Sequence, residues 1–376
     1  VVGDRVFVTE TKDKKVEIVR ALDRATGAEL WQQTWDGAMK VPFFAARNGA
    51  WIRATPAWAD GRLFIAGMRE VLVALDDRDG RELWRIDFVE QFDSKMPEFG
   101  FVCSPLAVPA SAAVPGGALY IEAANAVFSL DPATGAVRWR SAPLTDSDMM
   151  ANGTFSSPIL TEIAGRPHLL VQSRTHLVGL DPGDGAILWR QPIPSFRGMN
   201  ILTPTVHNDT VFTSSYRNGS HLVRLAAQPD GSLEASSAWT HKASGYMSSP
   251  VRIGSVVYLH LGNGRFTAYD LDRAASGADD AQLWTSKPGF GDYASLVAHG
   301  DKILALADNG TLYLLQADPT AFTLLDEAEI SDRATWAHLA VVGDELYVRE
   351  LDGLMKLRWT SPAEAPAADA AASAAR

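Results

Sequence analysis

The chain has 376 residues, of which 47% are hydrophobic, and its formal net charge is −11. A chain this acidic does not favour a broad nucleic-acid interface. No stretch reaches the roughly 18 consecutive apolar residues of a membrane-spanning helix. The single cysteine, Cys103, cannot form a disulfide within the chain, so cysteine usage does not indicate a redox compartment.

A pattern that ends in tryptophan repeats along most of the chain. An apolar strand is followed by Asp, a short polar turn with Gly, and a second strand that ends in Trp, as in 130–139, which reads LDPATGAVRW. Six tryptophans follow one another at intervals of 53, 55, 50, 50 and 45 residues, namely Trp31, Trp84, Trp139, Trp189, Trp239 and Trp284. A repeat of about 50 residues is typical of one four-stranded propeller blade.

A second marker keeps the same interval. Ser/Thr–Pro pairs open five of the units, at Thr55–Pro56, Ser104–Pro105, Ser157–Pro158, Thr203–Pro204 and Ser249–Pro250. Proline is tolerated where a strand begins, because its missing N–H is not needed there. With one unit before these pairs and two after them, at 294–297 and 337–344, the count is eight. We therefore predict an all-β fold, an eight-bladed β-propeller of four-stranded antiparallel blades.

The two ends do not match a complete ring. Val1–Val2 reads as the end of an innermost strand, and the last unit stops after 354–359 without an outermost strand. We expect residues 1–361 to form one propeller domain whose last blade is one strand short, in a chain trimmed from a longer one. The tail 362–376 is rich in Ala and Pro and is predicted to be disordered.

The repeat also carries a resemblance. The segments 75–84 (LDDRDGRELW), 130–139 and 180–189 (LDPGDGAILW) resemble the pyrroloquinoline-quinone-like (PQQ-like) propeller repeat, which quinoprotein dehydrogenases share with BamB-type outer-membrane assembly lipoproteins. The resemblance implies that the tryptophans pack between blades and that the Asp–Gly turn joins the two outer strands. It also implies a periplasmic or otherwise extracytoplasmic location.

The residues that a bound quinone would need are missing. Quinoprotein dehydrogenases often hold the quinone against a vicinal Cys pair, and this chain has neither such a pair nor a Cys–x–x–Cys–His haem site. The eight histidines show no His–x–His or His–Glu–x–x–His spacing, so a metal site has no support. We expect no cofactor and no metal, and dehydrogenase activity is the least favoured function.

The candidate site lies where two kinds of loop meet. In a four-stranded blade, the loop leading into the innermost strand and the turn joining the second and third strands open on one face around the central channel. Here these segments carry aromatic, Arg and Asn residues, which offer stacking area and forked donors. We predict a ligand-binding site at the channel mouth formed by Trp51, Arg53, Arg69, Arg174, Arg197, Asn200, Tyr246, Tyr293, Trp336 and His338. The alternative is that the aromatics plug the channel and the arginines pair with Glu10, Asp292 and Glu350.

Two classes of function stay open. The first is a monomeric, non-catalytic scaffold that binds a protein, a peptide or a small anionic or sugar ligand at the channel mouth. The second is a lyase or hydrolase acting on a small anionic or sugar substrate, with His338, Tyr246 or Glu350 as acid and base. Convergence of Arg, His and a carboxylate on one point would favour the enzyme, because a general base must reach its proton.

Overall fold

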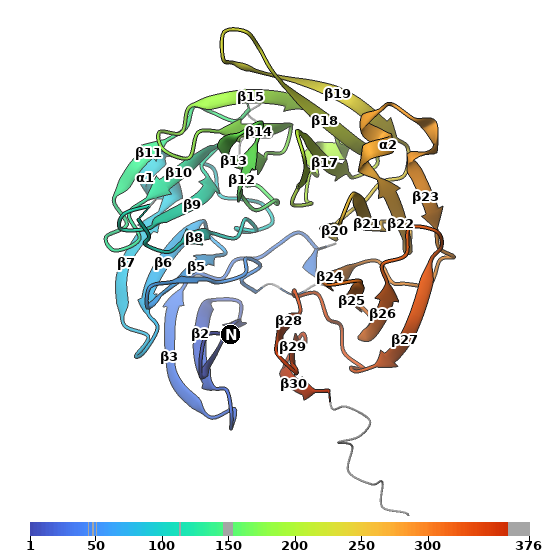
Figure 1. Ribbon diagram of the computed structural model, residues 1–376. Coiled ribbons are helices and arrows are strands. Elements are labelled where there is room, and N and C mark those ends of the chain that lie inside the picture. The colour runs from blue at the N-terminus through green and yellow to red at the C-terminus, as the bar shows by residue number, and fades with distance from the viewer. Residues whose placement is uncertain (44, 47–48, 50, 113, 146–152, 360–376) are drawn as a thin grey trace, which may run out of the picture.

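A computed structural model of the chain describes residues 1–359, apart from 44, 47–48, 50, 113 and 146–152 (Figure 1). Eight antiparallel sheets are arranged in a ring around a central axis, and each sheet is one blade (Figure 1). The predicted eight-bladed β-propeller is therefore confirmed. The predicted tail 362–376 lies outside the described residues.

The strands follow the chain from blade to blade. Blade 1 contains β1 (Arg5–Lys12), β2 (Val16–Asp23) and β3 (Glu29–Asp36); blade 2 contains β4 (Ala57–Ala59), β5 (Arg62–Gly67), β6 (Val71–Asp76) and β7 (Glu82–Asp87); blade 3 contains β8 (Leu106–Val108), β9 (Ala118–Ala123), β10 (Ala126–Leu130) and β11 (Val137–Arg140). Blade 4 contains β12 (Ile159–Ile163), β13 (Arg166–Gln172), β14 (His176–Leu180) and β15 (Ile187–Pro192), and blade 5 contains β16 (Thr205–His207), β17 (Thr210–Ser215), β18 (Gly219–Ala227) and β19 (Leu233–His241).

The remaining blades complete the ring. Blade 6 contains β20 (Val251–Ile253), β21 (Val256–Leu261), β22 (Arg265–Asp270) and β23 (Gln282–Thr285); blade 7 contains β24 (Ala294–His299), β25 (Lys302–Ala307), β26 (Thr311–Gln316) and β27 (Thr323–Glu329); blade 8 contains β28 (Ala340–Val342), β29 (Glu345–Arg349) and β30 (Leu354–Arg358). The helical elements are short: α1 (Phe88–Phe92), η2 (Phe196–Gly198), α2 (Leu271–Ala275) and η3 (Asp279–Ala281).

Blades 1 and 8 have three strands each among the described residues, and the other six blades have four. Blade 8 ends with β30 and has no outermost strand in this part of the chain, as the sequence predicts. In blade 1 the first strand, β1, pairs with β2. Before it, Val2 forms only an isolated bridge with Arg5, at the place where other blades have an innermost strand.

The repeat residues join neighbouring blades. The indole Nε1 of Trp84 donates to the carbonyl of Pro132 in the next blade, at 3.1 Å. Gly135 lies against the same indole, since a Cβ placed on it would be 2.8 Å from the ring, and its φ of +74° favours glycine. Two further pairs repeat this contact, namely Trp31 with Gly80 and Trp139 with Gly185. The inter-blade role implied for the tryptophans is confirmed at these positions.

The Asp of the repeat shapes its turn. Asp131 Oδ1 accepts the backbone N–H groups of Ala133 and Thr134, at 2.9 and 3.0 Å. The N–H of Gly135 then donates to the carbonyl of Asp131, which closes the turn. An Asp that caps its own turn in this way is common chemistry for short connections between strands.

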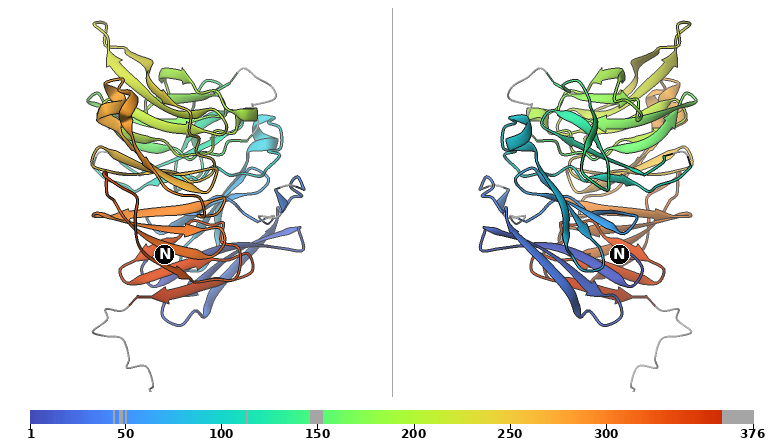
Figure 2. Two further views of the ribbon diagram at one scale, coloured as in Figure 1. Left: turned by 90° about the vertical axis from the view of Figure 1, so that its right-hand side faces the viewer. Right: turned by 90° about the vertical axis from the view of Figure 1, so that its left-hand side faces the viewer.

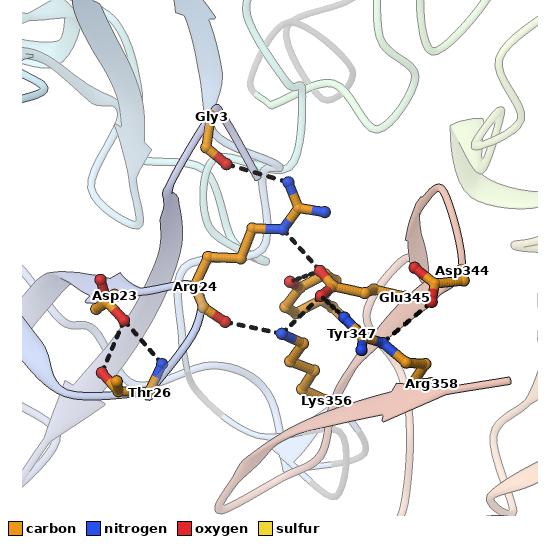
Figure 3. A network of polar contacts seen from close by, with 9 residues as sticks. All are labelled: Gly3, Asp23, Arg24, Thr26, Asp344, Glu345, Tyr347, Lys356 and Arg358. Atoms are coloured by element: carbon orange, nitrogen blue, oxygen red, sulfur yellow. Dashed lines mark hydrogen bonds and ion pairs between the residues drawn. The ribbon is translucent and has the colours of Figure 1, made fainter. Parts of the chain in front are cut away.

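A polar network crosses the seam between blades 8 and 1 (Figure 3). The Glu345 carboxylate, only 4% exposed, receives Arg24 Nε at 2.6 Å from blade 1 and Lys356 Nζ at 2.7 Å from its own blade. Arg358 and the Tyr347 hydroxyl also bind this carboxylate, at 3.1 and 2.5 Å. The network connects residues at opposite ends of the sequence and so closes the ring.

Two kinds of segment form the face that matters for function. We call the loops leading into the innermost strands the inner loops, and the turns between the second and third strands the second turns. In blade 5 they touch, because Phe196 N–H in the inner loop donates to the carbonyl of Tyr216 in the second turn, at 3.1 Å. In the side views, η2 and α1 lie on the same side of the ring (Figure 2), which we call the mouth face.

Candidate functional site

A cavity of about 470 Å³ opens at the centre of the ring. Six of the ten predicted site residues line it, namely Trp51, Arg53, Tyr246, Tyr293, Trp336 and His338. Arg349 from the end of β29 lines it as well. Within the described part of the chain, no Asp or Glu is among the lining residues, so the only permanent side-chain charges on the wall are the two arginines.

A ring of hydroxyl groups surrounds this cavity. Five lining residues stand two positions before the innermost strand of their blade, namely Thr55, Ser104, Ser157, Thr203 and Ser249. The N–H of Thr55 donates to Ser104 Oγ at 2.9 Å, and the N–H of Ser104 donates to Ser157 Oγ at 3.1 Å. The hydroxyls therefore bind neighbouring blades together. In blade 8 the same position is occupied by His338.

His338 belongs to an aromatic group from blades 7 and 8. Its Nδ1 lies 3.4 Å from the hydroxyl of Tyr293, whose ring stacks on Trp336 with the centroids 5.8 Å apart. The imidazole reaches the water of the channel, but protein surrounds it closely, and this desolvation lowers the pKa of His338. Burial raises the pKa of Tyr293. Both groups are therefore uncharged at neutral pH.

The two arginines of the wall are held by backbone carbonyls. Arg53 Nη2 donates to the carbonyl of Gly49 at 3.1 Å, while its Nε is buried and has no hydrogen-bond partner among the described residues. Arg349 donates to the carbonyls of Glu350 and Gly353, and its guanidinium lies over the Trp51 ring, 5.8 Å from the centroid. Burial lowers the pKa of both guanidinium groups.

Arginines and aromatic rings also alternate outward from the mouth, across blades 4 to 6. Arg174 lies over Phe155, Arg197 and Arg217 both lie over Phe196, Phe196 packs edge-on against Tyr216, and Tyr216 stacks on Tyr246 at 4.2 Å. We call these residues the arginine–aromatic arc: Phe155, Arg174, Phe196, Arg197, Tyr216, Arg217 and Tyr246. All of them stand on inner loops or second turns.

Two arginines of the arc have an unusual backbone. Arg197 has a φ of 53° and Arg217 a φ of 59°, in the left-handed region that residues with a Cβ rarely adopt. Such a conformation costs on the order of 1–3 kcal/mol and persists where the surrounding structure enforces it. Their guanidinium groups lie 5.3 and 4.9 Å from the Phe196 centroid, so the two strained positions hold two cations against one ring.

Comparisons with known proteins point to one family. The sequence profile of the family "Outer membrane protein assembly factor BamB" matches residues 15–277, from blade 1 into blade 6. The chain therefore belongs to the BamB family. BamB of Yersinia pestis is 25% identical over 274 residues, which are 69% of this chain and 64% of that protein. The serine/threonine-protein kinase AfsK of Streptomyces griseus is 33% identical over 125 residues, 33% of this chain and 13% of the kinase. The chain thus spans less than two thirds of either curated relative.

Solved structures agree on the fold. The crystal structure of BamB from Moraxella catarrhalis superposes with a TM-score of 0.62 at 16% identity, covering 94% of this chain and 95% of that one. The computationally designed protein Ika8 gives a TM-score of 0.59 at 10% identity, covering 95% of this chain and 97% of the designed chain. In the described residues, no helix is long and apolar enough to cross a membrane.

The remaining predicted residues of this BamB-family chain lie outside the cavity wall. Arg174 and Arg197 belong to the arc, and Arg69 is exposed on the second turn of blade 2. Asn200 is fully buried and donates to the carbonyls of Arg174 and Ile193, at 3.2 and 2.9 Å. Asn200 therefore uses its side chain to hold the loops. Of the other nine residues, six line the wall, Arg174 and Arg197 belong to the arc, and Arg69 belongs to neither; that they bind a ligand stays a prediction.

The structure also shows where the carboxylates named in the alternative predictions lie. Glu10 pairs with Arg20, at 2.6 Å, and not with a site arginine. Glu350 accepts a hydrogen bond from Ser331, at 2.5 Å, and is not part of the cavity wall. The suggested acid–base residues His338 and Tyr246 line the cavity without Glu350, so the three do not converge there.

Several residues of the wall and the arc were absent from the predicted site, Arg349, Arg217 and Phe196 among them. Arg349 and Arg217 stand on second turns, so their loop class was recognisable, but nothing in the sequence ranks them above the other arginines there. Phe196 precedes the predicted Arg197 and is 42% exposed. Its central place in the arc depends on the left-handed turns at Arg197 and Arg217, which the sequence does not indicate.

Proposed function

We propose that this BamB-family chain is an extracytoplasmic, non-catalytic scaffold that binds a partner protein through the arginine–aromatic arc on its mouth face. The name of the family and of its Yersinia pestis member, outer membrane protein assembly factor, supports a role in bringing proteins together. The arc offers the surface for it, because it extends over loops of three blades and contains an aromatic residue, Phe196, that is 42% exposed.

The pair of arginines on Phe196 is the observation that carries the proposal. Arg197 and Arg217 are both exposed, and neither has an ion pair to a carboxylate among the described residues. In a protein with a net charge of −11, two such cations on one ring are a local exception. A guanidinium that stacks on an aromatic face keeps its N–H edge available for a carboxylate. The arc therefore suits an acidic segment of a partner.

The experiment uses a fluorescent synthetic peptide in which Glu alternates with Phe, titrated into the full chain and followed by fluorescence anisotropy. Binding should weaken as salt is added, because the contact is between opposite charges near the surface. The Arg197→Ala and Arg217→Ala variants should each weaken binding by about 1–3 kcal/mol, the value of a hydrogen bond to a charged group. A peptide with Lys in place of Glu should not bind.

The matched control is Arg252→Ala. Arg252 is an exposed arginine beside the turn between β20 and β21, which is at the opposite end of the strands from the second turns. Its replacement should leave peptide binding unchanged. Equal loss in the control and the arc variants would contradict the proposal, as would binding that does not respond to any of these substitutions.

A further inference from the structure

The wall of the central cavity presents positive charge without a matching carboxylate. Arg53 and Arg349 both line it, and no Asp or Glu of the described residues does. Burial lowers the pKa of Arg53 with no carboxylate acting in the other direction. For Arg349, Glu10, Asp352 and Glu350 partly oppose the effect of burial, but none of the three lines the cavity. Burying a cation is unfavourable unless it is paired.

The local structure holds these cations in place. The ring of Trp51 lies directly on Gly49, where an added Cβ would be 1.7 Å from it, and the Gly49 carbonyl binds Arg53. The guanidinium of Arg349 lies over the Trp51 ring, 5.8 Å from the ring centroid. Trp51 therefore lies between the backbone that binds Arg53 and the guanidinium of Arg349. Arg53 Nε is buried and has no hydrogen-bond partner among the described residues.

The rest of the wall is aromatic and apolar. Trp336, Tyr293 and Tyr246 line the same cavity, together with Phe99, Phe155 and Met247. A space of about 470 Å³ is within the size range of small-molecule sites, which combine apolar walls with a few polar groups that fix orientation. Charge and shape together specify a ligand with one anionic end and one flat apolar end.

We propose that the cavity is a binding site for a small organic anion, a carboxylate or a similar group attached to an aromatic ring, with Arg53 and Arg349 holding the anionic end. The site goes beyond the proposed protein-binding function, because the arc and the arginines of the wall are different residues. The guanidinium groups of Arg53 and Arg349 supply the donors, and the aromatic side chains of the wall pack against the ring of the ligand.

The test is calorimetric titration of the full chain with 2-naphthoate, compared with the neutral 2-naphthalenemethanol and the cation 2-naphthylmethylamine. 2-Naphthoate should bind at one site, at least about tenfold more tightly than the neutral analogue. Arg53→Gln should weaken naphthoate binding about tenfold or more, and Arg53→Lys, which keeps the charge, should retain part of it. Thermal unfolding of each variant checks that it is folded.

Matched variants separate this proposal from the one before it. Arg217→Ala should leave naphthoate binding unchanged, and Arg53→Gln should leave binding of the Glu–Phe peptide unchanged. If naphthoate fails to bind, binds no better than its neutral analogue, or binds equally well to Arg53→Gln, the site is not an anion site. Each of these results leaves the peptide experiment on the arc unaffected.

Discussion

At the scale of single residues, backbone strain coincides with the proposed binding site on the mouth face. Arg217 adopts a φ of 59°, an angle that glycine adopts without strain and a residue with a Cβ does not. The chain therefore has an arginine at a position where the backbone of a glycine would be less strained. A strained residue at a position that presents a cation on Phe196 is consistent with selection for binding at the expense of some stability.

A pair of substitutions at this position tests the strain. Arg217→Gly and Arg217→Ala both remove the cation, so both should weaken peptide binding equally. Because a Cβ is unfavourable in the left-handed region, the Gly variant should be more stable than the Ala variant by about 1 kcal/mol. Chemical denaturation measures the difference. The reverse order, which is usual where φ is negative, would show that Arg217 is not left-handed.

A buried carboxyl group between blades 2 and 3 gives stability a pH dependence. Glu70 is 1% exposed and accepts hydrogen bonds from the Ala124 N–H at 3.1 Å and the Ser94 hydroxyl at 2.9 Å. Burial, the largest effect, raises the pKa of Glu70 to about 7. The folded state thus keeps a proton on Glu70 at pH values where the unfolded state, with a pKa of about 4.3, has already released it.

We therefore expect the free energy of unfolding to fall as the pH rises from about 4.3 to about 7, and to level off at higher pH. The Glu70→Gln variant keeps the shape of the protonated group and cannot ionise. At about pH 8 it should be more stable than the unmodified chain by up to a few kcal/mol, and at about pH 5 the two should be similar. Thermal unfolding across this range measures both. A constant difference at all pH values would show that Glu70 does not titrate.

At the scale of the structural elements, the contact between a tryptophan and a turn glycine joins each blade to the next. Gly135 and Gly27 have the same φ of +74°, but a Cβ on Gly135 would meet the Trp84 ring at 2.8 Å, whereas a Cβ on Gly27 would meet nothing within 4 Å. Blade 8, which precedes Gly27 in the ring, presents no such indole in the described residues. The two glycines therefore differ in packing alone.

This difference can be measured with two alanine substitutions. Gly27→Ala should cost only the strain of a left-handed Cβ, about 1–2 kcal/mol. Gly135→Ala should cost about 1–3 kcal/mol more, because the indole of Trp84 must also move. Denaturant unfolding gives both values. Equal losses would mean that the turn conformation, and not the indole contact, explains the glycine in the repeat.

The sequence predicts the repeating elements better than the site. Trp84, Asp131 and Gly135 act within one blade or between adjacent blades, so their spacing alone indicates the propeller and the blade count. Arg53 and Arg349 line the same cavity although nearly the whole chain lies between them, and no local pattern links them. Asn200 stands in one of the two predicted loop classes, but its side chain is buried and its amide donates to two backbone carbonyls, which the sequence does not indicate.

At the scale of the whole molecule, ion pairs join blade 8 to blade 1, at the seam where no indole packs on the turn glycine. Arg24 and Glu345 are 321 positions apart and meet at 2.6 Å across the seam (Figure 3). The hydrogen bonds from Lys356, Tyr347 and Arg24 hold the pKa of Glu345 well below its usual range. Its contribution to stability is therefore complete above about pH 4.3, the unfolded value, and is lost as the pH falls further.

Glu345→Gln should lower the melting temperature at neutral pH by several degrees, because three cations then share a site without a counter-charge. The difference from the unmodified chain should narrow as the pH falls below about 4, because the unfolded chain then binds a proton at Glu345 that the folded chain does not. Asp4→Asn is a suitable control, since Asp4 forms an exposed ion pair with Arg5 near the same seam. A melting temperature that does not change at neutral pH would show that the network does not close the ring.

The central claim is that the mouth face of blades 4 to 6 is where this propeller binds its partner. Hydrogen–deuterium exchange of the full chain, with and without the Glu–Phe peptide, tests it most directly. The account predicts slower exchange in the inner loop around Phe196 and the second turn around Tyr216, with no change at the turn between β20 and β21 on the opposite face. Protection confined to that opposite face, or to the outer strands of the blades, would contradict it.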